Sequence, residues 1–190
     1  MFKAKRRTVV TATAVTAVLL AGALAATLLT QGKGNASDGV VEYQVGHRPL
    51  APNVTGTSLT GSAIKLSSYR GKTVVLNFWG SWCAPCRGEA STLAVLDEQY
   101  GSQGVAFLGD DVADTPSNAL AFTRSFRITY PSFSDNGYLV VADFSQAGVQ
   151  VSDTPTTVVI DKTGHVVGSV LGAVNYGQLT TLLHEAGVNS

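Results

Sequence analysis

Two thiols separated by two residues are the first feature of this 190-residue chain that could do chemistry. Cys83 and Cys86 are its only cysteines, and they follow an apolar run, residues 74–78, where a helical pattern begins. Positions i and i+3 of a helix lie on one face, so the two sulfur atoms can meet and form a bond. Such a bond closes a very small ring and gains little loop entropy, which favours a reversible redox couple over a structural crosslink.

Two other kinds of site could use such cysteines. A tetrahedral zinc site needs two further ligands, but the sequence has no other cysteine and only three scattered histidines, His47, His165 and His184. A cysteine nucleophile paired with a histidine stays open, although it gives the second cysteine no role. Strand, turn and helix signals surround the motif as a redox dithiol requires, so the sequence favours a dithiol and no metal site.

The helix that follows the motif gives the two cysteines different roles. The pattern predicts a helix from about residue 84 to 100, ended by Gly101. Cys86, Ala90 and Leu93 fall at i, i+4 and i+7, so we expect Cys86 to face inward and Cys83 to lie at the exposed first turn. Helix N-terminal amides stabilise a thiolate, so Cys83 is the predicted attacking group and Cys86 the resolving one.

The N-terminus carries a pattern that directs a chain to a membrane. Residues 1–7 form a positively charged leader, and residues 8–30 contain no charge. A transmembrane anchor is favoured, because 23 residues could span the hydrocarbon core, but a signal peptide cleaved after the small-x-small pattern at residues 23–25 stays open. Positive charge before the span places everything after it outside the cytoplasm. Residues 31–45 are expected to be a flexible tether, and residues 46–190 the folded domain.

The composition limits the class of protein. Hydrophobic residues make up 45% of the chain and charged residues 14%, which excludes a disordered acidic or basic protein. The formal net charge is zero, but four of the 13 basic residues lie in the leader, leaving nine against 13 acidic ones. The folded part is therefore mildly acidic, and no basic stripe suggests a nucleic-acid partner.

Further strands and helices are predicted after the motif. Residues 105–109 resemble a buried strand, and Asp110, Asp111 and Asp114 are expected in a solvated loop beyond it, because their spacing matches no calcium loop. The remaining elements are a helix capped by Thr115 and Pro116, a short helix over 138–145, a hairpin formed by 157–160 and 165–170, and a closing helix over 175–186.

The run Trp82-Cys83-Ala84-Pro85-Cys86, placed after Val74-Val75-Leu76-Asn77-Phe78-Trp79, resembles the thioredoxin superfamily. The likeness is to its TlpA/ResA-like extracytoplasmic redoxins and covers about residues 46–186. It implies an α/β, thioredoxin-like fold, in which helices flank a central mixed β-sheet. It also implies an N-terminal β-hairpin extension, for which residues 47–72 supply short β-prone pieces.

The resemblance assigns roles to residues around the dithiol. It makes Thr154-Pro155 a cis-proline loop that packs against the dithiol and offers backbone groups to a bound chain, and it makes Trp82 a lid over the disulfide. Pro85 stiffens the turn between the cysteines. Glu89 occupies the position of an acid that controls proton movement in this branch, although an acid in the first turns of a helix can simply complement its dipole.

The resemblance leaves the role of one residue open, and the sequence departs from the family pattern at two others. Trp79 could be either a lid or a core residue. Asn77 stands where thioredoxins have a buried acid, and an amide cannot exchange a proton. Ser91 stands where the branch often has a proline, so the helix is expected to be less kinked.

The resemblance also implies a function. We expect thiol-disulfide exchange with extracytoplasmic protein thiols or disulfides, without a cofactor other than the disulfide itself. Reduction is favoured, for example of an apocytochrome c, with electrons from a membrane thiol-disulfide carrier. The expected location is the bacterial cell membrane, with one span and an extracytoplasmic catalytic domain, or secretion after signal cleavage. Oxidative folding of secreted proteins is the close rival, and the sequence also leaves open a thiol peroxidase and a non-catalytic binding module.

Overall fold

The central β-sheet is built around β5, the buried strand that leads into the two cysteines. The computed structural model describes residues 35–37, 39–151 and 154–189. The sheet order is β1-β2-β9-β8-β5-β6-β7; β5, β6 and β7 are mutually parallel, and the other neighbouring pairs are antiparallel. The strands of this sheet are β1 (Asn35–Ser37), β2 (Val40–Glu42), β5 (Thr73–Trp79), β6 (Val105–Val112), β7 (Ser132–Asp135), β8 (Thr156–Ile160) and β9 (Val166–Leu171).

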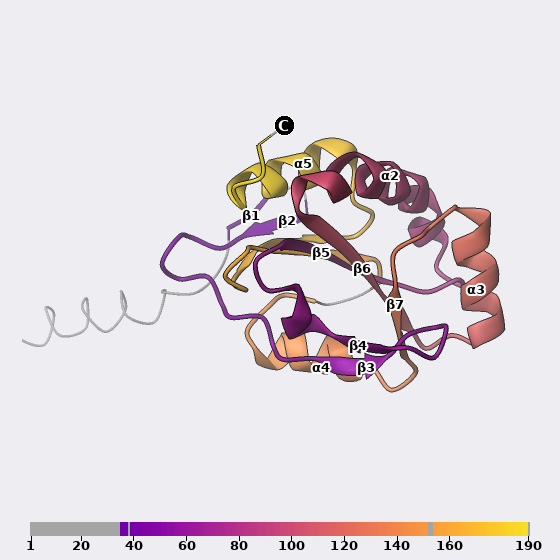
Figure 1. The fold of residues 1–190 in the computed structure, drawn as a ribbon. Coiled ribbons are helices and arrows are strands. Elements are labelled where there is room, and N and C mark those ends of the chain that lie inside the picture. Colours follow the sequence, from indigo (N-terminus) through magenta and orange to yellow (C-terminus); the bar gives the residue numbers. More distant parts are fainter. Residues whose placement is uncertain (1–34, 38, 152–153, 190) are drawn as a thin grey trace, which may run out of the picture. The chain divides into compact units, whose positions relative to one another are not determined.

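Helices cover both faces of this sheet (Figure 1). One face carries α2 and α5, with α3 beside α2, and the other carries α4 together with a two-stranded sheet. This confirms the expected mixed sheet flanked by helices with a hairpin extension. The elements are β3 (Thr55–Thr57), β4 (Ala63–Lys65), the 3-10 helices η1 (Leu66–Tyr69) and η2 (Gly101–Gln103), α2 (Ala84–Tyr100), α3 (Pro116–Ser125), α4 (Leu139–Gln146) and α5 (Tyr176–Glu185).

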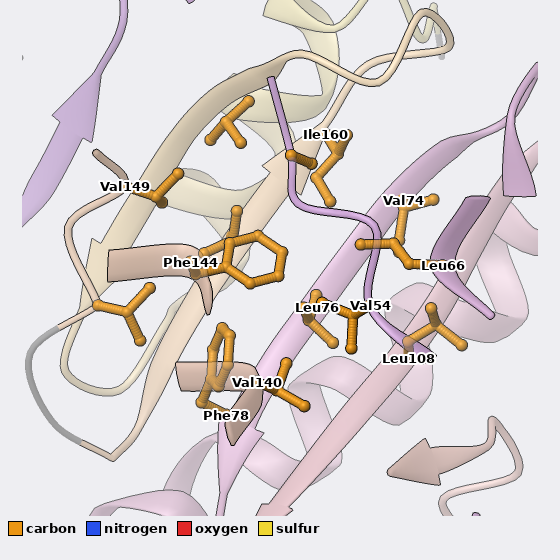
Figure 2. Close-up of a cluster of buried hydrophobic side chains, with 14 of the residues drawn as sticks. Val54, Leu66, Val74, Leu76, Phe78, Leu108, Val140, Phe144, Val149 and Ile160 are labelled. Carbon is orange, nitrogen blue, oxygen red and sulfur yellow. The ribbon is translucent and has the colours of Figure 1, made fainter. Parts of the chain in front are cut away.

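Alternate side chains of β5 enter two different hydrophobic cores. Leu76 and Phe78 pack on the α4 face, where the ring of Phe144 meets that of Phe78 edge to face at 5.6 Å (Figure 2). Val75 packs on the opposite face against apolar residues of α2 and α5. Every residue of β5 is buried, which explains its nearly continuous apolar sequence. The strand is therefore held from both sides and gives the cysteine loop a rigid support.

The helix boundaries follow local capping signals. Thr115 caps α3 by accepting a hydrogen bond from the Asn118 amide, with Pro116 at the first helical position, as the sequence predicts. Asn175 and Gln178 form a reciprocal capping box at the start of α5. These helices begin where their side chains satisfy the first free amides.

The structure contradicts the prediction that three aspartates lie in a solvated loop. Asp110 and Asp111 belong to β6, which runs three residues further than predicted and pairs with both β5 and β7. Their relative exposures are 0% and 1%, and Asp114, in the turn beyond the strand, is also buried. The backbone pairing on both sides outweighs the polar character of these side chains, so the strand continues through them.

The N-terminal tether expected over 31–45 also differs from the structure. Residues 40–42 form β2, which pairs with β9, and Val41 is fully buried. The side chain of Val41 can reach the hydrophobic core only when this segment pairs with β9, which accounts for the formation of β2. The leader over 1–7, the span over 8–30 and the start of the tether lie outside the described residues. In the part of the chain that the structure describes, no helix has the length and apolar character needed to cross a membrane.

Candidate active site

The two cysteines form a disulfide at the N-terminus of α2. Cys83 is the N-cap residue, its backbone is extended, and its Sγ accepts a hydrogen bond from the Cys86 amide at 3.1 Å. The Cα atoms of the two residues lie 5.3 Å apart. Pro85 occupies the second helical position, where its missing N–H leaves no helical hydrogen bond unmade. The spacing of the motif thus places both sulfur atoms in the first turn, as predicted.

Both cysteines are buried, although the sequence predicts an exposed position for Cys83. Cys86 faces inward as expected, with 1% relative exposure, but Cys83 is only 3% exposed. They share an apolar cluster with Trp79, Ala119 and Phe122. Trp79 stacks on Phe122 with ring centroids 4.6 Å apart and is buried, so it is a core residue and not a lid. Packing from α3 therefore covers a first turn that is exposed in an isolated helix.

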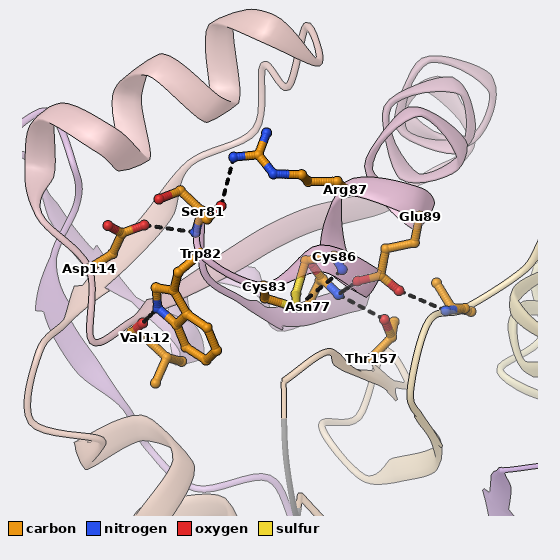
Figure 3. Close-up of a disulfide and its surroundings, with 11 residues drawn as sticks. Asn77, Ser81, Trp82, Cys83, Cys86, Arg87, Glu89, Val112, Asp114 and Thr157 are labelled. Atoms are coloured by element: carbon orange, nitrogen blue, oxygen red, sulfur yellow. Dashed lines mark hydrogen bonds between the residues drawn. A yellow bond between two sulfur atoms is a disulfide. The ribbon is translucent and has the colours of Figure 1, made fainter.

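The loop before Cys83 is fastened to the chain that follows β6 (Figure 3). The Ser81 amide donates to Asp114 Oδ2 at 2.7 Å, and the other oxygen of Asp114 accepts from the Thr115 amide. Arg87, one residue beyond Cys86, donates from Nη2 to the Ser81 carbonyl at 2.9 Å. Both sides of the Ser81 residue are thus held, which fixes the approach of the chain to Cys83.

Trp82 is held against the end of β6. Its indole Nε1 donates to the Val112 carbonyl at 3.2 Å, and its side chain points toward the end of β6 (Figure 3). The residue nevertheless remains 56% exposed, next to the cysteine loop. A Cβ at Gly80 would lie 2.5 Å from Trp82 Nε1, so this indole position requires glycine there. Trp82 therefore presents an apolar surface beside the disulfide.

Glu89 is buried one turn beyond Cys86 and is fully hydrogen-bonded. Its Oε1 accepts from Asn77 Nδ2 at 2.8 Å, and its Oε2 accepts from the Val174 amide at 2.7 Å. Asn77 also donates to Thr157 Oγ1 at 3.0 Å, which fixes the orientation of its amide. Burial raises the pKa of Glu89 to about 7, although both hydrogen bonds act to lower it. A carboxyl group with this pKa can both give and take a proton near neutral pH.

The peptide bond between Thr154 and Pro155 is cis, as the resemblance implies. Pro155 is buried, and its carbonyl accepts from the Gly172 amide at 2.9 Å. Thr156, the next residue, pairs with Phe78 near the carboxyl end of β5. The fold therefore brings the cis-proline segment to the end of the sheet from which the cysteine loop starts.

Asp110 and Asp111 lie at the carboxyl end of β6, and Asp114 follows the strand. Burial is the main cause that raises the pKa of Asp110 to about 9, and the charges of Asp135 and Asp111 add to it. Burial also raises the pKa of Asp111 to about 7, together with the charge of Asp114. Within the described ranges, no group of three or more His, Cys, Asp or Glu side chains could hold a metal ion. Asp114 positions the cysteine loop through its contact with the Ser81 amide.

Sequence reasoning missed several contacts of this site. The amide of Val174 and the carbonyl of Val112 are backbone groups, and no residue type marks them in a sequence. Asp114 was expected in a solvated loop, although an acid just before a helix cap is a signal for a local backbone contact. Arg87 lies directly after the motif, yet its contact with Ser81 depends on the shape of the loop.

Comparison with known proteins agrees with this geometry. The model of the AhpC/TSA family matches residues 48–169. Thiol-disulfide oxidoreductase ResA of Bacillus cereus is 33% identical over 135 residues, which cover 71% of this chain and 75% of the relative. ResA of Geobacillus kaustophilus is 36% identical over 124 residues, covering 65% and 68%.

Solved structures give the same picture. A DsbF homologue from Corynebacterium diphtheriae superposes with a TM-score of 0.71 and 32% identity, covering 80% of this chain and 98% of that one. A secreted thiol-disulfide isomerase from Corynebacterium glutamicum gives a TM-score of 0.72 with 31% identity, covering 82% and 97%. Both similarities extend over nearly the whole of the solved chains.

Proposed function

Because the chain belongs to the AhpC/TSA family and, within it, to the TlpA/ResA-like thiol-disulfide oxidoreductases, we propose that it reduces disulfides in extracytoplasmic proteins. The observation that carries the proposal is the Cys83–Cys86 disulfide at the N-terminus of α2, with the titratable Glu89 on the same helix. Thiol-disulfide exchange itself is supported by the ResA relatives and by the Cys83–Cys86 pair. The direction, the client and the location are our proposal.

The reaction begins with the reduced protein. The Cys83 thiolate, stabilised by the free amides and the dipole of the helix N-terminus, attacks one sulfur of the client disulfide. A mixed disulfide forms, and one client thiolate leaves and takes up a proton. Cys86 then loses its proton and attacks Cys83 Sγ, which releases the second client thiolate and forms the Cys83–Cys86 disulfide. Two electrons have moved from the dithiol to the client.

Glu89 is the proposed proton acceptor for Cys86 in the second step. It lies three residues further along α2, and its pKa of about 7 matches the pH at which a thiol must lose a proton. Regeneration of the dithiol needs two electrons from another dithiol. We propose a membrane thiol-disulfide carrier for this step, with an apocytochrome c as a candidate client, and no cofactor apart from the disulfide.

Site roles beyond the two cysteines follow from position. Trp82 offers an exposed apolar surface to a client, and Thr154, oriented by its cis bond to Pro155, offers backbone groups at the same end of the sheet. Pro85 holds the first turn of α2 in a fixed geometry.

Insulin reduction with dithiothreitol as the electron source tests the two cysteine roles. We expect Cys83→Ser to abolish turnover, and Cys86→Ser to accumulate a covalent mixed disulfide with the client, because the resolving thiol is missing. Mass spectrometry of the adduct identifies the sulfur involved. Full turnover by Cys83→Ser, or an adduct on residue 86 in a Cys83→Ser variant, would contradict the assignment. Hydrogen peroxide consumption measured in parallel would reveal a thiol peroxidase, and we expect none.

Oxidation of secreted proteins is the second candidate direction. The similarity to a DsbF homologue and to a secreted thiol-disulfide isomerase favours it. Equilibration with glutathione separates the two directions. A reduction potential near that of thioredoxin, about −270 mV, supports the reductant, whereas one near that of DsbA, about −120 mV, supports the oxidant.

The proposed location is the outer side of the cell membrane, with residues 8–30 as the anchor. The basic leader and the uncharged run support it. Fractionation of cells that express the full chain, followed by N-terminal sequencing, distinguishes the anchor from a cleaved signal peptide.

A further inference from the structure

A groove runs along the exposed side of α2 and α3 and begins beside the dithiol. It consists of two hollows of about 400 and 410 Å³ that share Ser125 in their walls. Along α2 its lining residues recur about every turn, so the groove follows one face of this helix. We refer to it as the α2–α3 groove, whose near part is defined by Trp82, Arg87, Ala121, Phe122 and Ser125. Its far part contains one acidic and one basic residue, Glu98 and Arg127, whereas Arg87 is the only charged residue among the described residues that line the near part.

The near end of the α2–α3 groove is lined by residues that neighbour the two cysteines in the chain or in the core. Phe122 forms part of the groove wall and also packs in the same apolar cluster as Cys83 and Cys86. Trp82, on the opposite wall, directly precedes Cys83 and is half exposed. A polypeptide whose cysteine reacts at Cys83 therefore has neighbouring residues within reach of this groove.

Arg87 gives this end of the groove an unneutralised positive charge. Its guanidinium donates once, to the Ser81 carbonyl, and lies over the Phe122 ring at 5.6 Å from the centroid. The ion pairs found among the described residues both involve Arg48 and not Arg87. A guanidinium has five N–H groups, so donors remain for a ligand carboxylate. The contacts with Ser81 and Phe122 hold the group in place, which reduces the entropy lost when it binds a carboxylate.

The wall opposite α3 is also held before any ligand arrives. Asp114 accepts from the Ser81 amide, and the Val112 carbonyl accepts from the Trp82 indole. Figure 3 shows Ser81 and Trp82 held by these two contacts, with Arg87 reaching back over the loop. A groove with fixed walls does not have to be formed on binding, which favours its use as a docking surface.

We propose that the α2–α3 groove binds the segment of the client polypeptide next to its reacting cysteine, and that Arg87 selects segments that carry Asp or Glu. The inference rests on the proposed exchange with protein clients and names a chemical feature of those clients. The occupant is an acidic polypeptide segment, because the near end of the groove carries the positive group of Arg87 beside the exposed Trp82. Its other lining includes the uncharged polar residues Ser81, Asn118 and Ser125.

Matched peptide disulfides test the selection. Each peptide contains one cysteine in a mixed disulfide with 2-mercaptoethanol, and the two peptides differ only by Asp or Asn on both sides of that cysteine. The reduced protein is mixed with each peptide, and the released peptide thiol is followed by chromatography. We expect the Asp peptide to react about five- to tenfold faster at low salt, and less so at high salt, because the contact is electrostatic and partly exposed.

Two variants of equal charge assign the preference to one residue. Arg87→Gln should bring the ratio of the two rates close to one. Arg124→Gln removes an equal charge from the exposed surface of α3 outside the groove and should keep the ratio of the unchanged protein. A ratio near one in the unchanged protein, or a ratio that survives Arg87→Gln, overturns the proposal.

The symmetric disulfide of 2-mercaptoethanol separates this inference from the proposed function. It is uncharged and too small to fill the groove, so failure to reduce it contradicts the exchange activity itself. Ala121→Trp, which fills the groove from the exposed side of α3, should slow both peptides more than this small disulfide. Equal slowing of all three disulfides overturns docking in the groove. Self-association that is lost in Ala121→Trp would assign the groove to a second copy of the chain and also overturn the proposal.

Discussion

Glu89 and Asp110 are two buried carboxyl groups near the same end of the sheet, and they differ in what surrounds them. Glu89 is 2% exposed, and each of its oxygens accepts a short hydrogen bond, one from Asn77 and one from the Val174 amide. Asp110 is fully buried, and neither of its oxygens has a hydrogen-bond partner in the described part of the protein. Both lose the stabilisation that water gives to a carboxylate, but only Glu89 has donors that replace part of it.

The consequence is a difference in protonation at neutral pH. The pKa of Glu89 is raised to about 7, whereas that of Asp110 is raised to about 9, with the charges of Asp135 and Asp111 adding to the effect of burial. Glu89 therefore exchanges its proton in the range where thiol chemistry takes place, and Asp110 stays neutral there. A buried acid becomes useful for catalysis when donors hold its ionised form.

The largest expected effect is on stability, when Asp110 is replaced by Asn. A carboxyl whose pKa rises from 3.8 to about 9 on folding gives its full stability below pH 3.8, and this is lost as the pH rises through about 9. Each pH unit above 3.8 lowers the free energy of unfolding by about 1.4 kcal/mol, so the loss at pH 7 is about 4 kcal/mol. Asp110→Asn stays neutral in both states, so we expect its free energy of unfolding to exceed that of the unchanged protein by up to this amount.

Urea unfolding from pH 4 to 9 measures the effect. The advantage of Asp110→Asn should increase steadily with pH over the whole range. Asp143→Asn, at an exposed position on α4, is the matched control and should change the free energy of unfolding by less than about 0.5 kcal/mol. A constant difference between Asp110→Asn and the unchanged protein would mean that Asp110 is ionised in the fold.

A smaller effect on stability is expected for Glu89→Gln, with a different dependence on pH. The pKa of Glu89 rises from 4.5 to about 7, so its contribution is present below pH 4.5 and is lost by about pH 7. The free energy of unfolding of the variant should gain about 3 kcal/mol relative to the unchanged protein between these values and then level off. The same unfolding series measures it, with Glu98→Gln, at an exposed position of α2, as control.

The levelling is the feature that separates Glu89 from Asp110. A difference that keeps growing to pH 9 would show that Glu89 is as poorly paired as Asp110. The same variant should also lose any inflection near pH 7 in the rate of mixed-disulfide resolution, because that step is the one in which Glu89 takes a proton.

The smallest expected effect is a further rise in the pKa of Glu89, toward that of Asp110, when Glu89 loses one of its donors. Asn77→Ala removes a donor that lowers the pKa of Glu89, so this pKa should rise by about one unit, equivalent to about 1.4 kcal/mol. Titration of the Glu89 carboxyl carbon by nuclear magnetic resonance measures the shift. Thr157→Val, which removes only the second partner of Asn77, should shift it less. An unchanged pKa in Asn77→Ala would assign the effect to the Val174 amide alone.

Several features of the protein were predictable because they depend on neighbours in the chain. The three-residue spacing places Cys83 and Cys86 in one helical turn, the apolar run before them becomes β5, and α2 has the predicted bounds. Capping at Thr115 is local as well, and the cis bond before Pro155 was predictable through resemblance to a family. The resemblance was most informative where a short sequence motif determines the local backbone conformation.

Other features depend on parts of the chain that meet only in the fold. The contacts that tune Glu89 join residues 12 and 85 positions away, and the contact that holds Ser81 spans 33. Asp110 and Asp111 resemble loop residues in the sequence, but strand pairing with β5 and β7 buries them. Cys83 lies in a first turn that α3 covers. The sequence thus determined which groups react, since their spacing is covalent. The tertiary structure decided how readily they gain and lose protons, because burial and donors come from distant segments.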